Sequence, residues 1–165
     1  MKNLAILFLT ALLIFPTVGN AEISLLPKEV CNMIMVEKGF ENGLYKPIYP
    51  GSEIHHCQSE PMNIGSGIIP NEIIYSSKGS EESLEEMRLN LTVYEQNSEA
   101  PAMAELESLG LYLVEKVTGE AATEEVKELL SDLEPKVVET ENHSFEIEKD
   151  VWDTGEGYSV IFYIR

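Results

Sequence analysis

Basic residues are scarce in this chain, and that scarcity excludes two classes of partner. The 165 residues include 11 Lys and Arg against 29 Asp and Glu, which gives a formal net charge of −18 at pH 7. Such a charge repels nucleic acids and anionic membrane surfaces, so we expect neither as a partner. It attracts basic proteins and cations, although acidity by itself also keeps a protein soluble.

Complete catalytic motifs are missing as well. Residues 65–67 read GSG but lack the G-x-S-x-G frame of a nucleophile elbow, and Gly155 and Gly157 do not complete a dinucleotide-binding G-x-G-x-x-G. No phosphate-binding loop is found. Paired acids such as Glu81 and Glu82 are expected by chance in so acidic a chain. We therefore predict no catalytic residues and no cofactor.

Long apolar runs are absent except at the N-terminus. Lys2 precedes 12 largely apolar residues, Leu4 to Phe15, and Gly19-Asn20-Ala21 supplies the small residues of a cleavage site. The run is shorter than the about 20 apolar residues that span a membrane. Residues 1–21 are thus predicted to be a secretory signal peptide. We expect a mature protein without a membrane anchor, exported to the periplasm or the extracellular space.

Residues 22–165 form one domain in this interpretation, which is long enough for a self-supporting core. Because Lys2 is the only charged residue of the signal, the mature chain has 10 basic and 29 acidic residues and a net charge of −19. Apolar residues at helical spacing predict three helices. These helices are expected at residues 27–39, 101–119 and 123–135.

Alternation of apolar and polar residues predicts the strands, most clearly where Met87, Leu89, Leu91 and Val93 alternate with polar neighbours. The stretch 39–53 is rich in Gly and Pro and is expected to be a long loop. Strands are expected at 53–59, 71–77, 85–96, 145–151 and 158–164, with a short extra strand at 136–140. The predicted fold is α+β, in the order α-β-β-β-α-α-β-β, with helices on one face of an antiparallel sheet of five to six strands.

Only two cysteines are present, and one follows two histidines in the stretch IHHCQSE, residues 54–60. In an exported chain the single possible pairing, Cys31 with Cys57, predicts a disulfide. A catalytic pair of Cys57 and His55 is the rival interpretation, but oxidation would remove the thiolate. A zinc site is disfavoured because His55 and His56 point to opposite faces of a strand. We predict no metal site.

Hard oxygen ligands also cluster around a predicted turn near the C-terminus. Asp150, Asp153 and Glu156 do not match the EF-hand spacing. Weak calcium binding at this turn stays an open alternative.

Binding is the function that these observations favour. In the 39–53 loop, Tyr45, Ile48 and Tyr49 stand beside two prolines, a composition typical of interface hot spots, and His55 and His56 could add pH-sensitive contacts. We expect an exported inhibitor or immunity-type protein that acts on a basic envelope enzyme or toxin. One alternative is an accessory subunit of an envelope or secretion assembly, whose last strand would add to a partner's sheet. A second is a hydrolase that uses carboxylates or a free Cys57.

Overall fold

The computed structural model describes residues 25, 27–28, 30–31, 37–41 and 43–165. The predicted signal peptide lies outside these residues, as do residues 29 and 32–36 of the predicted first helix. Within that helix, the described residues Pro27, Lys28, Val30, Cys31 and Glu37 are helical.

The described part of the chain has a mixed α+β fold with an open antiparallel sheet of eight strands and two α-helices. The elements are β1 (Lys46–Pro47), β2 (His55–Gln58), β3 (Met62–Ile64), β4 (Asn71–Gly79), β5 (Leu84–Val93), the 3-10 turn η1 (Gln96–Ser98), α2 (Glu99–Thr118), α3 (Glu124–Asp132), β6 (Lys136–Glu139), β7 (Ser144–Val151) and β8 (Tyr158–Ile164).

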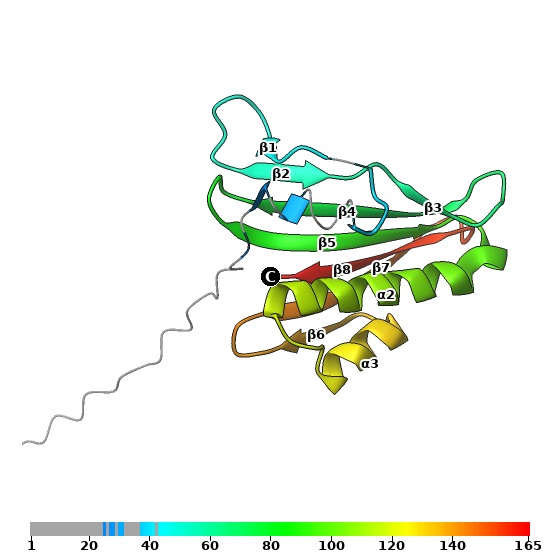
Figure 1. The fold of residues 1–165 in the computed structure, drawn as a ribbon. Coiled ribbons are helices and arrows are strands. Elements are labelled where there is room, and N and C mark those ends of the chain that lie inside the picture. The colour runs from blue at the N-terminus through cyan, green and yellow to red at the C-terminus, as the bar shows by residue number, and fades with distance from the viewer. Residues whose placement is uncertain (1–24, 26, 29, 32–36, 42) are drawn as a thin grey trace, which may run out of the picture.

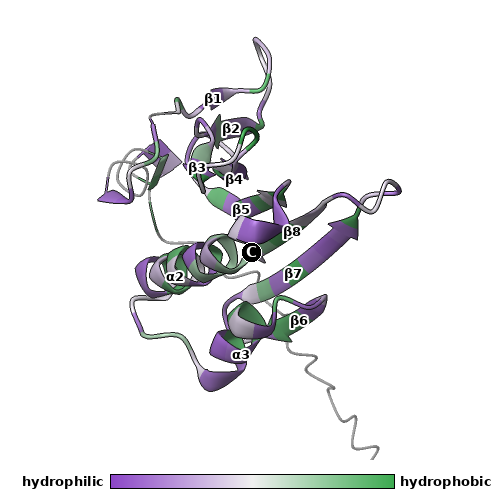
Figure 2. Ribbon diagram, turned by 90° about the vertical axis from the view of Figure 1, so that its right-hand side faces the viewer, coloured by the Kyte–Doolittle hydropathy of each residue, from purple (hydrophilic) through white to green (hydrophobic). Residues whose placement is uncertain are grey.

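The strands follow the order β1-β2-β4-β5-β8-β7-β6, and β3 pairs with β4 beside β2. Both helices lie on one side of the sheet, α2 against β4 and β5 and α3 against β6 and β7 (Figures 1 and 2). Neither helix covers the other face of the sheet, which is open in the described part of the chain. The strand order places the last strand, β8, between β5 and β7, so β8 has no free edge to offer a partner's sheet.

The core forms between the inner face of the sheet and the apolar stripe of α2. Leu89 and Leu91 of β5 and Phe162 of β8 are almost fully buried, and Leu106 and Leu113 of α2 cover them at helical spacing. Burying each such side chain contributes about 1.5–3 kcal/mol. The alternation that predicted these strands therefore reflects a sheet with one buried and one open face.

Helix ends follow the local signals in the sequence. Helix α2 stops at Gly119, which has a φ of 72° and donates its backbone N–H to the Glu115 carbonyl. Helix α3 starts after Thr123, whose hydroxyl accepts a hydrogen bond from the Val126 N–H. Helix α2 begins at Glu99, two residues before the predicted start at Pro101. Pro101 is tolerated inside the first turn because the N–H that a proline lacks would have no intrahelical partner there.

The predicted strand count of five to six is wrong, because two short strands, β1 and β3, lie in segments expected to be irregular. Strand β3 continues the line of β2 along β4, and the break between them is filled by Ser59. Ser59 donates its N–H to the Tyr75 carbonyl, and its hydroxyl accepts the Tyr75 N–H. Pro61, just before β3, has no backbone N–H to donate to the strand ladder.

Strand β5 ends at Val93 and not at residue 96 as expected. The Asn71 side-chain oxygen accepts the backbone N–H groups of Tyr94 and Glu95, both at 2.8 Å. These two residues therefore leave the sheet ladder, and the chain turns into η1.

The predicted disulfide between Cys31 and Cys57 is present, with Cα atoms 6.2 Å apart. Both residues are buried, and the bond joins the helical N-terminal segment to β2, near one edge of the sheet. A disulfide of this kind is compatible with an exported protein.

Reduction of this disulfide should lower the free energy of unfolding by about 3.5 kcal/mol, because the bond closes a loop across a sequence separation of 26 residues. Urea titrations of the oxidised and reduced protein, followed by tryptophan fluorescence, measure the difference. The variant Cys31→Ala/Cys57→Ala should match the reduced protein. Equal unfolding midpoints for the oxidised and reduced forms would show that the bond adds nothing to stability.

Candidate functional site

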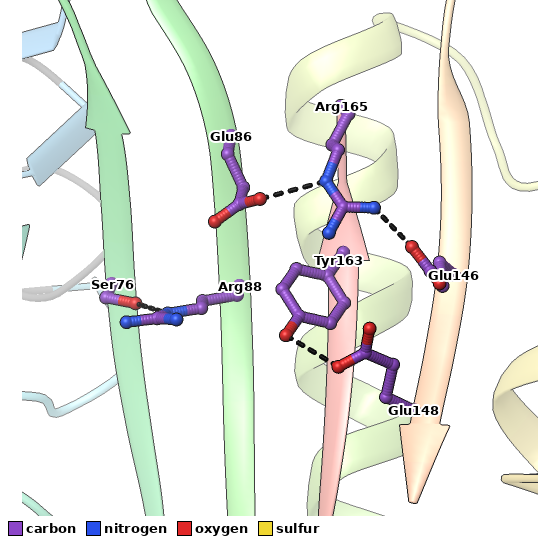
Figure 3. Close-up of polar contacts among 7 residues, drawn as sticks. All are labelled: Ser76, Glu86, Arg88, Glu146, Glu148, Tyr163 and Arg165. Atoms are coloured by element: carbon purple, nitrogen blue, oxygen red, sulfur yellow. Dashed lines mark hydrogen bonds and ion pairs between the residues drawn. The ribbon is translucent and has the colours of Figure 1, made fainter. Parts of the chain in front are cut away.

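Polar side chains on the open face of the sheet are joined by ion pairs and hydrogen bonds. Arg165 lies between Glu86 and Glu146 and pairs with both, at 2.9 Å from Nε to the Glu86 carboxylate. Figure 3 shows two further contacts on this face: Tyr163 donates to Glu148, and Arg88 Nε donates to the Ser76 hydroxyl. This face therefore presents a polar network centred on Arg165.

Exposed apolar side chains gather instead at the two ends of the sheet. At one end, around the β1–β2 hairpin, these are Leu44, Ile48, Tyr49 and Ile54. At the other end, where β4 begins and β5 and β7 finish, they are Ile68, Ile69, Tyr94 and Val151. Groups of exposed apolar side chains mark candidate interaction sites.

The stretch 39–53 was expected to be a long loop, but its second half belongs to an ordered β1–β2 hairpin. Residues 48 and 54 are joined by a hydrogen bond from the Ile48 N–H to the Ile54 carbonyl, and Ser52 N–H bonds to the Tyr49 carbonyl. Pro50 and Gly51 occupy the two central positions of that turn, and Gly51 has a φ of 84°, as a type II turn requires. We call residues 48–54 the hairpin tip.

The structure separates the predicted binding residues into two groups. Ile48 and Tyr49 project from the hairpin tip, with 54% and 66% of their surfaces exposed. Tyr45 instead supports the hairpin: its hydroxyl donates to the Ser80 carbonyl at 2.6 Å, and its ring stacks on His55 with 5.6 Å between centroids. His56 follows on the opposite face of β2 and is half-buried.

The phenol of Tyr45 is held in its neutral form by its surroundings. Partial burial, with a smaller contribution from the Glu85 carboxylate, raises the pKa of Tyr45 to about 12. The tyrosine therefore stays a hydrogen-bond donor to the β4–β5 turn over the whole physiological pH range.

A cavity of about 410 Å³ opens beneath the hairpin. It is lined by Lys28, Tyr45, Lys46, Pro47, Gly51, Ser52, His55 and Glu81. Lys28 and Lys46 form no ion pair with any described residue, which they share with Lys38, Lys78, Arg88 and Lys136. The cavity brings these two lysines together, with Glu81 as the one carboxylate of its lining, and the lysines could accept a carboxylate of a ligand. Sequence reasoning missed it because its residues come from three separate segments.

Metal and thiol chemistry find no support in the described residues. Among them, no group of three or more His, Cys, Asp or Glu side chains is arranged to hold a metal ion, which leaves the calcium alternative at Asp150, Asp153 and Glu156 without a ligand set. Cys57 lies in the disulfide and is not a free thiol.

No helix in the described ranges has the length and apolar character to cross a membrane.

Comparison of the chain with known protein families, with curated proteins and with solved structures found no match.

Replacing Tyr45 by Phe should lower the free energy of unfolding at pH 7 by about 1 kcal/mol, because the hydrogen bond to Ser80 is lost. The same change should alter stability in alkali. Since the folded protein holds this proton up to about pH 12, the stabilisation is complete below pH 10, the ordinary pKa of tyrosine, and is lost as the pH rises from 10 to 12.

Urea titrations between pH 7 and 12 test both effects. Stability of the variant should fall less steeply above pH 10 than that of the wild type. Some slope should persist in the variant, because the pKa of Tyr112 is also raised to about 12, first by burial and then by its hydrogen bond to Glu37. If stability falls equally steeply above pH 10 in the variant and the wild type, the Tyr45 hydroxyl does not contribute to the loss of stability in alkali.

Proposed function

We propose that this protein is a small, acidic, exported binding protein that occludes a basic envelope enzyme or toxin, as an inhibitor or immunity-type protein does. One observation carries the proposal: an ordered hairpin tip that exposes Ile48, Tyr49 and Ile54 to solvent. The tip is the surface through which the protein contacts its partner.

The fixed conformation of the hairpin favours high affinity. Apolar and aromatic side chains that insert into a partner's pocket contribute most of the binding free energy in many interfaces. A loop that must be ordered on binding loses part of that energy. Here the turn at Pro50 and Gly51, the Ile48–Ile54 hydrogen bond and the Tyr45–Ser80 hydrogen bond fix the tip before a partner arrives.

Charge supports a basic partner. A net charge of −19 on the mature chain accelerates the approach of a basic protein at low ionic strength. Near the tip, the lysines of the cavity add a second element of recognition, because Lys28 and Lys46 can bind one carboxylate of the partner through charge-assisted hydrogen bonds. The preferred partner surface is therefore basic overall, with an acidic group beside an apolar pocket.

An accessory subunit of an envelope assembly is the alternative proposal, and it would have to use a different edge from the one first expected. The last strand is central in the sheet. Strand β6 lies at the edge, and its Val137 has 49% of its surface exposed. This strand could pair with a strand of another protein.

The hydrolase alternative keeps only its carboxylates, since Cys57 is oxidised.

Replacing Ile48 and Tyr49 together by Ser should reduce partner capture more than tenfold, because the exposed anchors of the tip are lost. Oxidised mature protein is used as bait in envelope extract at low salt, and captured proteins are quantified by mass spectrometry. Val137→Ser is the matched control, since it removes an exposed apolar side chain from the other edge of the sheet. Recovery of the same proteins in the same amounts by the hairpin variant argues against the proposal.

Lys46→Glu should weaken binding of the captured partner several-fold more than Lys136→Glu does. Both lysines are exposed and both changes alter the net charge equally, but only Lys46 lines the cavity. Titration calorimetry at two salt concentrations separates the local effect from general charge. Equal losses for the two variants would exclude a carboxylate contact in the cavity.

A further inference from the structure

The end of the sheet opposite the hairpin carries a second group of apolar side chains. Ile68 is fully exposed and Ile69 largely so, and both precede β4. Tyr94 follows β5, Val151 ends β7, and Trp152 comes next. We call these five residues the distal patch: Ile68, Ile69, Tyr94, Val151 and Trp152. In Figure 1 the β3–β4 loop and the end of β7 lie at the same end of the sheet, away from β1.

The loop that carries Ile68 and Ile69 is fixed to the end of β5. Besides accepting the two N–H groups of residues 94 and 95, the Asn71 side chain donates to the Glu95 carbonyl at 3.1 Å. Gly67 packs so closely on Glu95 that a Cβ at this position would lie 2.3 Å from the carboxylate. The apolar loop is therefore held in place by the neighbouring strand.

Trp152 joins the ends of β5 and β7 across the start of β8. Its ring lies 5.4 Å from that of Tyr94, measured between centroids. Gly157 lies beneath the ring, and a Cβ there would come within 2.5 Å of it. The backbone N–H of Trp152 also donates a hydrogen bond to the Gly157 carbonyl at 3.1 Å. The aromatic part of the distal patch is thus preformed.

The surroundings of the distal patch are uniformly acidic. Segments 65–72, 94–100 and 150–158 contain no Lys, Arg or His. Their acidic residues are Glu72, Glu95, Glu99, Asp150, Asp153 and Glu156. The adjacent Lys149 is already paired with Glu134 at 2.9 Å. This end differs from the hairpin end, where two lysines line the cavity.

We propose that the distal patch is a second docking surface, which binds a basic protein segment with apolar side chains placed between its Lys and Arg residues. An apolar centre with an acidic border is complementary to such a segment. A second copy of this chain would bring like charges together, and an anionic membrane would be repelled. The two ends of β4 are about 26 Å apart, so the hairpin tip and the distal patch contact separate partners or separate parts of a large one.

Trp152 is the only tryptophan of the chain, so its fluorescence reports on the distal patch alone. Oxidised mature protein is titrated at low salt with a short synthetic peptide of alternating lysine and leucine. We expect a saturable blue shift as the peptide covers the indole. Oligolysine with the same number of charges should bind more than tenfold more weakly.

Two variants locate the site. Ile68→Ser/Ile69→Ser should raise the Kd of the peptide more than tenfold, and Ile48→Ser/Tyr49→Ser should leave it unchanged. Both pairs are exposed, so the fold should persist in each variant, which far-UV circular dichroism checks. A Kd that is the same in all three proteins, equal binding of oligolysine, or no change in fluorescence would overturn the proposal. These outcomes do not depend on the role of the hairpin tip.

Discussion

The disulfide between Cys31 and Cys57 is the constraint on which the candidate binding surface depends. Strand β2 is short, and it pairs on one side with a two-residue strand and on the other with the last residues of β4. Such limited pairing holds a hairpin weakly. The covalent bond fixes the middle of β2 to the N-terminal segment, and Tyr45 fixes the start of the hairpin to the β4–β5 turn. Without these two attachments the hairpin tip would lose its defined position.

The surfaces of the molecule divide by chemistry. The inner face of the sheet is apolar and covered by helices, whereas the open face is polar and carries the ion pairs of Arg165 with Glu86 and Glu146. Apolar groups that contact solvent occur mainly at the two ends. One end carries an ordered hairpin above a basic cavity, and the other carries an aromatic and aliphatic patch with acidic borders. These two ends are the surfaces that we propose for recognition.

Local patterns predicted the central elements and failed at the edge. The alternation of Leu89 and Leu91 with polar neighbours identified β5, and Gly119 and Thr123 marked the ends of the helices, because these signals depend on nearby residues alone. Strands β1 and β3 were missed, since they exist through pairing with residues up to 11 positions away, such as Met62 with Ile73. The basic cavity and the distal patch were missed for the same reason: each unites side chains from segments that are distant in sequence.

We propose that the chain leaves the reducing cytosol, is cleaved and acts as an oxidised binding protein. Intact-mass analysis after thiol alkylation, performed separately on cytosolic and exported fractions of the producing cell, tests this claim most directly. We expect an exported chain that begins at Glu22 and carries no alkylated cysteine. A full-length cytosolic chain with two alkylated cysteines would contradict the account, since Cys57 would then be a thiol beside His55 and His56.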